Sequence, residues 1–169
     1  MEIRTTLGGI PLFADVLSSS QLDQLASRCH AVDYEAGTTL MTEGDFGTFM
    51  VAILEGQLEV SVAGTRHPSR QVAIVGPGDI VGEMSLLTGA RRSATVTARE
   101  HARVVEITKV ALEAVFARSP ELLDRMEEVL IARRAELEKI AEDEHAHRLL
   151  GLRTDEIAGA VRRFFGRGS

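Results

Sequence analysis

The sequence predicts a mainly β protein, a small sandwich or barrel with flanking helices, and three features of the chain support this. Most of its 15 glycines lie between Gly8 and Gly89, whereas the interval 90–150 contains none. The glycine-rich part consists of short β-prone segments separated by Gly, Pro, Asp and Ser at intervals of roughly 8–12 residues, as in small all-β folds. From Ser119 onward the apolar residues instead follow the period of a helix.

The β body is expected to span about 31–107. Its predicted strands are Ala31–Glu35, Thr38–Met41, Thr48–Leu54, Leu58–Val62, Val72–Val75, Ala94–Ala98 and Val104–Ile107. Before this body, the run Ser18–Ser20 is a good N-cap for a helix that reaches Cys29 and places Leu22 and Leu25 on one face. After it, the apolar spacing predicts a helix over Lys109–Ala117.

A long helix is predicted from Ser119 to about His147. Its Ser-Pro-Glu opening supplies an N-cap, a proline at the first helical position and an acid in the first turn. The apolar stripe consists of Leu123, Met126, Leu130, Leu137, Ile140 and Ala141. Arg133 occupies the position that would continue this stripe. Either it lays its stem on the core with its charge in water, or its cation faces a molecule bound between the helix and the β body.

The composition is that of one soluble domain. A chain of 169 residues that is 44% hydrophobic can bury a core without disulfides or a structural metal. The single Cys29 cannot form an internal disulfide, and the chain opens without an apolar stretch long enough for a signal peptide, so a cytoplasmic location is expected. No apolar run approaches the ~20 residues of a membrane-spanning helix. The net charge of −6 argues against general binding to nucleic-acid phosphates.

The segment 76–96, GPGDIVGEMSLLTGARRSATV, carries the most chemical information. Within it, 82–87 predicts a helix of barely two turns that Gly89 ends, and Arg91-Arg92-Ser93 is expected to begin a strand. So short a helix is unstable by itself, so packing or a ligand must stabilise it.

A helix start followed by a guanidinium can bind an anion. Glu83 beside it would repel a phosphate unless it accepts hydrogen bonds from hydroxyl groups of the same ligand, and a sugar phosphate meets both conditions. A direct Glu83–Arg92 pair across a surface turn explains these residues equally well.

This segment resembles the phosphate-binding cassette of cyclic nucleotide-binding domains. The matching residues, in order, are Gly82, Glu83, Met84, Ser85, Arg92, Ser93 and Ala94. Further segments resemble the turns and strands of that family: 10–13, the turn at Gly37, 43–45, 56–60 and 77–79. Arg91 departs from the pattern, because many members have proline there. The match selects Arg92 for the ligand and, since side chains alternate along a strand, leaves Arg91 for solvent or a partner.

The resemblance implies an antiparallel, jelly-roll-like β-roll with an N-terminal helix, a short phosphate-binding helix and a long C-terminal lid helix. It implies that Arg92 pairs with the cyclic phosphate and that Glu83 accepts from the ribose 2′-hydroxyl. Amides of Met84, Ser85 and Ala94 would complete the polar cage, and Ser93 could donate to a phosphate oxygen or a guanine edge. The base is expected against Val60, Val62 and Val72, capped by Arg133, with Arg134 as the substitute.

The expected function is therefore a cyclic nucleotide-binding regulatory module in which cAMP, possibly cGMP, favours closure of the long helix. Its effector would be a channel, a transporter or a partner protein, and the long helix could also pair between subunits. A scaffold of the same fold that binds no nucleotide is the alternative. A transcription regulator would need a helix-turn-helix after His147, where the chain has too few residues. No enzymatic motif is present, so neither catalysis nor a cofactor is expected.

The C-terminal part gives weaker signals. His145 and His147 follow an acidic run, but residues two apart on a helix do not share a face, so a solvated helix end is favoured over a metal site. The domain is expected to cover 1–147 and an amphipathic tail 148–169. In that tail, Thr154–Gly168 predicts a helix that could lie on a membrane surface, on another subunit or on this domain.

Overall fold

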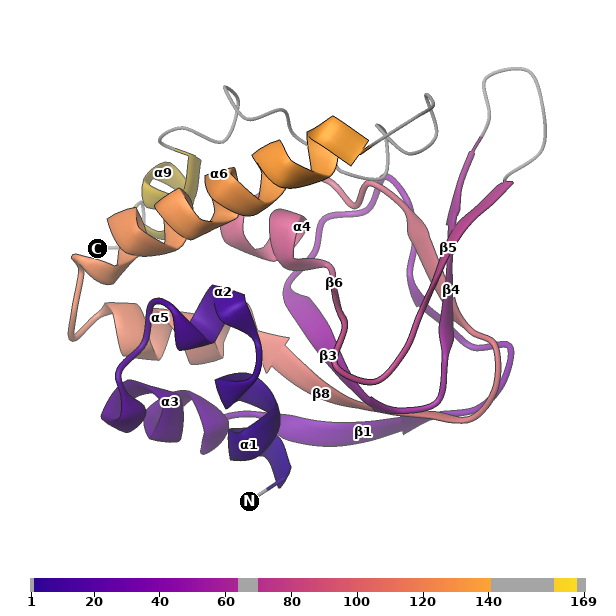
Figure 1. Ribbon diagram of the computed structural model, residues 1–169, viewed down its shortest axis with the longest axis horizontal. Coiled ribbons are helices and arrows are strands. Elements are labelled where there is room, and N and C mark those ends of the chain that lie inside the picture. The colour runs from indigo at the N-terminus through magenta and orange to yellow at the C-terminus, as the bar shows by residue number, and fades with distance from the viewer. Residues whose placement is uncertain (1, 64–69, 141–159, 167–169) are drawn as a thin grey trace.

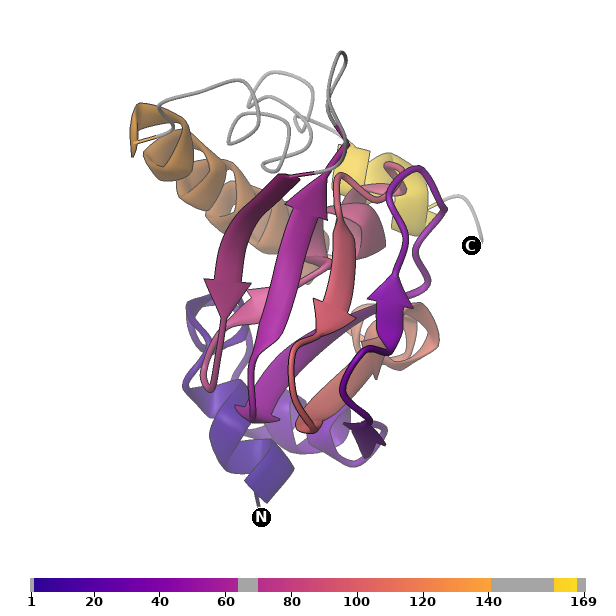
Figure 2. The same cartoon turned by 90° about the vertical axis from the view of Figure 1, so that its right-hand side faces the viewer.

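The computed structural model describes residues 2–63, 70–140 and 160–166. Two four-stranded antiparallel sheets, with strand orders β1-β8-β3-β6 and β2-β7-β4-β5, form a β-roll (Figures 1 and 2). The strands are β1 (His30–Tyr34), β2 (Thr39–Met41), β3 (Phe49–Glu55), β4 (Leu58–Val62), β5 (Arg70–Val75), β6 (Ile80–Val81), β7 (Thr95–Ala98) and β8 (Ala102–Thr108). The predicted mainly β fold with flanking helices is confirmed.

Alternating side chains explain why the strands form where they do. In β4, Leu58, Val60 and Val62 are buried while Glu59 and Ser61 between them are half-buried, the period of a strand with one face on a core. The sequence prediction missed β6, whose two residues pair with Val51 and Ala52 of β3. It was also wrong to begin a strand at Arg91–Ser93, because β7 starts at Thr95 and Arg91 forms only an isolated bridge with Phe46.

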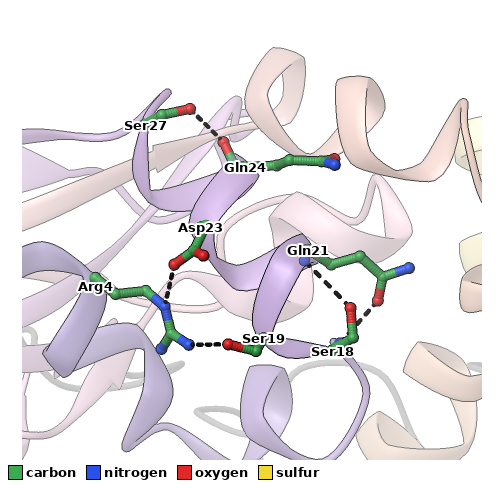
Figure 3. Close-up of polar contacts among 7 residues, drawn as sticks. All are labelled: Arg4, Ser18, Ser19, Gln21, Asp23, Gln24 and Ser27. Atoms are coloured by element: carbon green, nitrogen blue, oxygen red, sulfur yellow. Dashed lines mark hydrogen bonds and ion pairs between the residues drawn. The ribbon is translucent and has the colours of Figure 1, made fainter.

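Three short helices precede the roll: α1 (Glu2–Gly8), α2 (Pro11–Ala14) and α3 (Ser19–Ala26). The sequence analysis anticipated α3 alone. As predicted, Ser18 is its N-cap, and the capping box is completed by Gln21, whose side chain accepts from the Ser18 amide (Figure 3). Arg4 of α1 donates to Asp23 at 2.7 Å and to Ser19 at 3.1 Å, which joins α1 to α3.

The remaining helices are α4 (Glu83–Thr88), α5 (Lys109–Phe116), α6 (Leu122–Ile140) and α9 (Ala160–Gly166). The long helix begins later than predicted, because 119–121 form a turn in which the Leu122 amide donates to the Ser119 carbonyl. Pro120 is therefore not at the first helical position of α6. The predicted continuation to His147 and the His145/His147 pair lie outside the described residues, as does the start of the predicted tail helix at Thr154.

Two apolar cores hold the molecule together. The first lies among the helices and includes Leu12, Phe13, Leu112, Met126 and Val161. The second lies between the two sheets and includes Met41, Ile53, Val60, Val62 and Val104. Figure 1 shows the helices gathered at one end of the β-roll. The long helix α6 belongs to the first core but reaches toward the second, and the site lies where these two regions meet.

Candidate ligand-binding site

A cavity of about 230 Å³ lies between the β-roll, α4 and α6. Its volume is somewhat below the ~300–1,000 Å³ of most small-molecule pockets. The lining residues are Met41, Val60, Ala73, Val75, Ile80, Val81, Gly82, Glu83, Met84, Ser85, Arg91, Arg92, Ser93, Ala94, Val96, Leu130, Arg133 and Arg134. Strand residues supply an apolar surface, and the charged residues come from α4, the 91–92 segment and α6. Such a cavity can take a ligand that has both an apolar part and an anionic part.

The short helix α4 forms one wall of the cavity, and its ends are set by two glycines. Gly82 is the N-cap with φ 88° and Gly89 the C-cap with φ 80°, values that side-chain-bearing residues rarely adopt. Side-chain bonds hold the helix, because Ser85 Oγ donates to the Ala90 carbonyl at 2.6 Å. Leu86 and Leu87 anchor it in the first core. These contacts explain how a helix of only six residues is stable.

Arg92 is buried, with only 5% of its surface exposed, and its guanidinium lies beside the start of α4. Nη1 donates to the Gly82 carbonyl at 3.1 Å and Nη2 to the Phe49 carbonyl at 2.6 Å. The guanidinium also lies over the Phe49 ring, 5.0 Å from its centroid. Because an Arg has five N–H donors, two carbonyls can fix the group and still leave donors for an anion in the cavity.

The loop between β2 and β3 provides the seat for Arg92. The Arg92 amide donates to the Asp45 carbonyl at 2.7 Å, and the Gly44 amide donates to the Arg92 carbonyl at 2.9 Å. The absence of a side chain at Gly47 is required, because a Cβ there would lie 2.6 Å from both Arg92 Nε and Ser85 Oγ, and closer still to Arg92 Cζ. The motif pointed to Arg92, but sequence reasoning gave Gly47 no role.

Glu83 opens α4 and lines the cavity close to several positive charges. Burial raises the pKa of its carboxyl group, while its backbone hydrogen bond, Arg133 and Arg92 oppose that rise. Burial also lowers the pKa of Arg92, against the charges of Glu83 and Asp45. The alternative of a Glu83–Arg92 pair across a surface turn does not describe this arrangement, because Arg92 is buried and bonded to backbone carbonyls.

The helix α6 brings two arginines to the cavity. Arg133, the charge that interrupts the apolar stripe, is half-buried and lines this cavity and a neighbouring hollow next to Ile10 and Pro11. Arg134, named as its substitute, is buried at 3% exposure and lines the same cavity. The structure therefore brings both to the site, with Leu130 one turn earlier on the wall.

Of the three valines predicted to contact the base, Val60, Val62 and Val72, only some lie at the cavity. Val60 lines the cavity, whereas Val62 does not and is fully buried in the second core. Val72 lies in β5, but its side chain falls outside what the structure describes. The sequence analysis missed the remaining apolar wall, which comprises Met41, Ala73, Val75, Ile80, Val81, Val96 and Leu130. Alternation along β5 places Val75 on the same face as Ala73, but nothing in the sequence distinguishes this face from the other. The residues on β2 and β6 meet the site only through the fold.

Arg91 is exposed, as expected, yet it also borders the cavity. It donates to the Gly44 carbonyl at 3.1 Å and lies over the exposed Phe46 ring, 4.4 Å from its centroid. With Arg92, Arg133 and Arg134 it makes four lining arginines against one lining carboxylate. The cavity is thus locally cationic within a chain of net charge −6.

Two searches of the described residues were negative. None of the described helices is long and apolar enough to cross a membrane. No group of three or more His, Cys, Asp or Glu residues within 2–63, 70–140 and 160–166 is placed to hold a metal ion.

Comparison with known proteins places this geometry among known folds. The family model described as the cyclic nucleotide-binding domain matches residues 31–119. A cyclic nucleotide-gated potassium channel of Rhizobium etli is 30% identical over 128 residues, which is 76% of this chain and 34% of the channel.

Two solved structures agree over more of their own lengths. The N-terminal domain of a transcriptional regulator from Streptomyces coelicolor A3(2) has a TM-score of 0.68 at 26% identity, covering 82% of this chain and 98% of that one. A cyclic nucleotide-binding domain from Methylobacillus flagellatus has a TM-score of 0.66 at 31% identity, covering 82% and 80%. The chain spans 34% and 51% of the lengths of the first two curated relatives it matches.

Proposed function

Because the chain belongs to the cyclic nucleotide-binding domain family, we propose that it binds a cyclic nucleotide in the cavity between α4, α6 and the β-roll. The observation that supports this most directly is that Arg133, from α6, lines the same cavity as Glu83 and Arg92 of the 82–94 motif, about 40 residues earlier in the sequence. Family members are in general ligand-binding regulatory domains rather than enzymes.

In this proposal the phosphate binds to Arg92, whose guanidinium is already fixed by the Gly82 and Phe49 carbonyls. A fixed, desolvated guanidinium loses little freedom on binding an anion. Glu83 accepts a hydrogen bond from the ribose 2′-hydroxyl. A neutral hydroxyl suits a carboxylate in a partly desolvated position better than a second anion would, and Arg133 and Arg92 keep the carboxylate compatible with burial.

The base lies on the apolar surface that includes Val60, Val75 and Val96. Arg133 covers it from α6, since a guanidinium can stack on an aromatic face. Arg134 adds a second, more deeply buried positive charge to the same wall.

Ligand binding then regulates by shifting the position of α6. A ligand can bias two positions of a helix only if it makes different contacts in each. The contacts of Arg133 with the base supply this difference, because they exist only when α6 lies over the cavity. We propose further that cAMP is preferred and that the domain controls a channel, a transporter or a partner protein. Similarity to the Rhizobium etli potassium channel supports control of a channel.

Isothermal titration calorimetry tests the proposal. We expect the wild-type protein to bind cAMP saturably, with cGMP binding more weakly, and Arg92→Ala to lose about 2–5 kcal/mol of binding free energy, roughly 30-fold or more in affinity. Arg28→Ala is the matched control, because Arg28 is exposed just after α3 and does not line the cavity. Heat changes absent with both nucleotides would favour a scaffold that binds no nucleotide.

A further inference from the structure

The helix α9, near the end of the chain, packs against this domain and not merely beside it. Val161 is fully buried and belongs to the first core. The helix contacts both α4 and α6. Figure 1 shows it next to the first half of α6, on the side of the molecule where the helices gather. The sequence left three locations open for the predicted tail helix: a membrane surface, another subunit or this domain. In the structure, α9 lies on this domain.

Phe164 of α9 touches the end of the short helix α4. A Cβ placed on Gly89, the C-cap of α4, would lie 2.7 Å from a ring carbon of Phe164, so the aromatic ring lies directly on the glycine backbone. Gly89 is in the left-handed region, and its amide closes α4 on the Ser85 carbonyl at 3.0 Å. Phe164 thus covers the last turn of a helix whose first turn carries Glu83.

The neighbouring ring, Phe165, also holds α9 in place. Phe165 meets Phe116 of α5 edge to face, with ring centroids 5.1 Å apart. The Lys109 ammonium lies 4.1 Å from the Phe164 centroid and 5.6 Å from that of Phe165. These contacts attach α9 to α5, which itself is anchored in the first core through Leu112.

We propose that α9 is a clamp for the ligand site, with Phe164 as a positioning residue that holds α4 against α6. The inference rests on the proposed function. It follows from α9 contacting the two helices that wall the cavity: Glu83, Met84 and Ser85 on α4, and Arg133 and Arg134 on α6. A six-residue helix cannot keep its position by its own propensity. Loss of the Phe164 contact therefore loosens both walls together.

The coupling has a direction and a required counterpart. Docked α9 favours the closed arrangement of α4 and α6, so undocking it must weaken nucleotide binding. By thermodynamic linkage, bound nucleotide must strengthen α9 docking by the same factor. A residue that only adds stability to the fold would show neither effect under conditions in which the wild type and the variant are both fully folded.

The test compares Phe164→Ala with Arg163→Ala, whose side chain is on the exposed side of α9, in titrations with cAMP well below both melting temperatures. We expect Phe164→Ala to bind about tenfold more weakly, Phe164→Leu to recover most of the affinity, and Arg163→Ala to match the wild type. In the wild type, saturating cAMP should slow amide hydrogen exchange in α9.

Each outcome separates the clamp from the site. Equal affinities of wild type and Phe164→Ala, or α9 exchange unchanged by cAMP, overturn the clamp while leaving the nucleotide site intact. A wild-type protein that binds neither cAMP nor cGMP overturns the proposed function, and the clamp with it. If Phe164→Ala does not fold, the exchange measurement on the wild type decides alone.

Discussion

Replacement of Gly47 by alanine should damage the nucleotide site through Arg92, although residue 47 does not itself line the cavity. Gly47 has no positive φ, so its backbone conformation permits alanine. The new Cβ would lie 2.6 Å from Arg92 Nε and from Ser85 Oγ. Atoms at that separation must move apart, and the Arg92 side chain has more rotatable bonds than that of Ser85 with which to move.

The structure allows the two consequences to be estimated separately. Overpacking costs about 1–3 kcal/mol of folding free energy, and the Gly→Ala change returns about 0.4–1 kcal/mol through the unfolded chain. The melting temperature should therefore fall by only a few degrees. Binding should be weakened more, because a displaced guanidinium no longer meets the phosphate. The loss of binding free energy can reach that expected for removing Arg92, about 2–5 kcal/mol.

The assay is a double-mutant cycle by calorimetry with cAMP. Gly47→Ala should lose at least about tenfold in affinity, equivalent to ~1.4 kcal/mol. The same change in an Arg92→Ala background should cost nothing further, since the two act through one interaction. Gly76→Ala is the control, because a Cβ there meets nothing closer than 3.9 Å. Full affinity in Gly47→Ala, or losses that simply add in the double variant, would refute this role of the loop.

Three further changes test other parts of the site and core. Glu83→Gln should raise the melting temperature at pH 7 more than at pH 4. Burial raises the pKa of the Glu83 carboxyl in the folded protein above the ordinary value of about 4.3, so its ionisation at higher pH destabilises the native state. A larger gain at pH 4 would contradict this. Arg133→Ala should weaken cAMP binding by about 0.5–2 kcal/mol with little change in stability. Arg134→Ala removes a buried side chain and should therefore also lower the melting temperature. Identical melting curves for the two variants would count against these different roles of Arg133 and Arg134. Burial raises the pKa of Cys29 to about 12, so a thiol reagent at pH 8 should modify it only when the protein unfolds, and rapid labelling of the folded protein would disagree.

The predictable part of the fold depends on patterns within a few residues. Alternation in Leu58–Val62 marked β4, and the glycines at positions 82 and 89 marked both ends of α4. The two-residue β6 has no pattern of its own and exists because β3 offers it partners. The opening at Ser119 was interpreted as a helix start because a turn and a first helical turn favour the same residues.

The site shows the same division. Glu83 and Arg92 could be found because they stand in one short motif, and Arg133 because a charge interrupts an apolar stripe. The role of Gly47 could not be found, since it arises only when the β2–β3 loop passes beneath Arg92. Val62 shares the period of Val60 but lies beyond the reach of the cavity, a difference set by how far the cavity extends along β4.

A crystal structure of the protein grown with cAMP tests the central claim most directly. The account predicts the nucleotide in the cavity between α4 and α6, with its phosphate within hydrogen-bonding distance of Arg92 and its ribose hydroxyl at Glu83. Arg133 should lie over the base. A nucleotide bound elsewhere on the molecule, or bound in the cavity with its phosphate away from Arg92, would contradict the account.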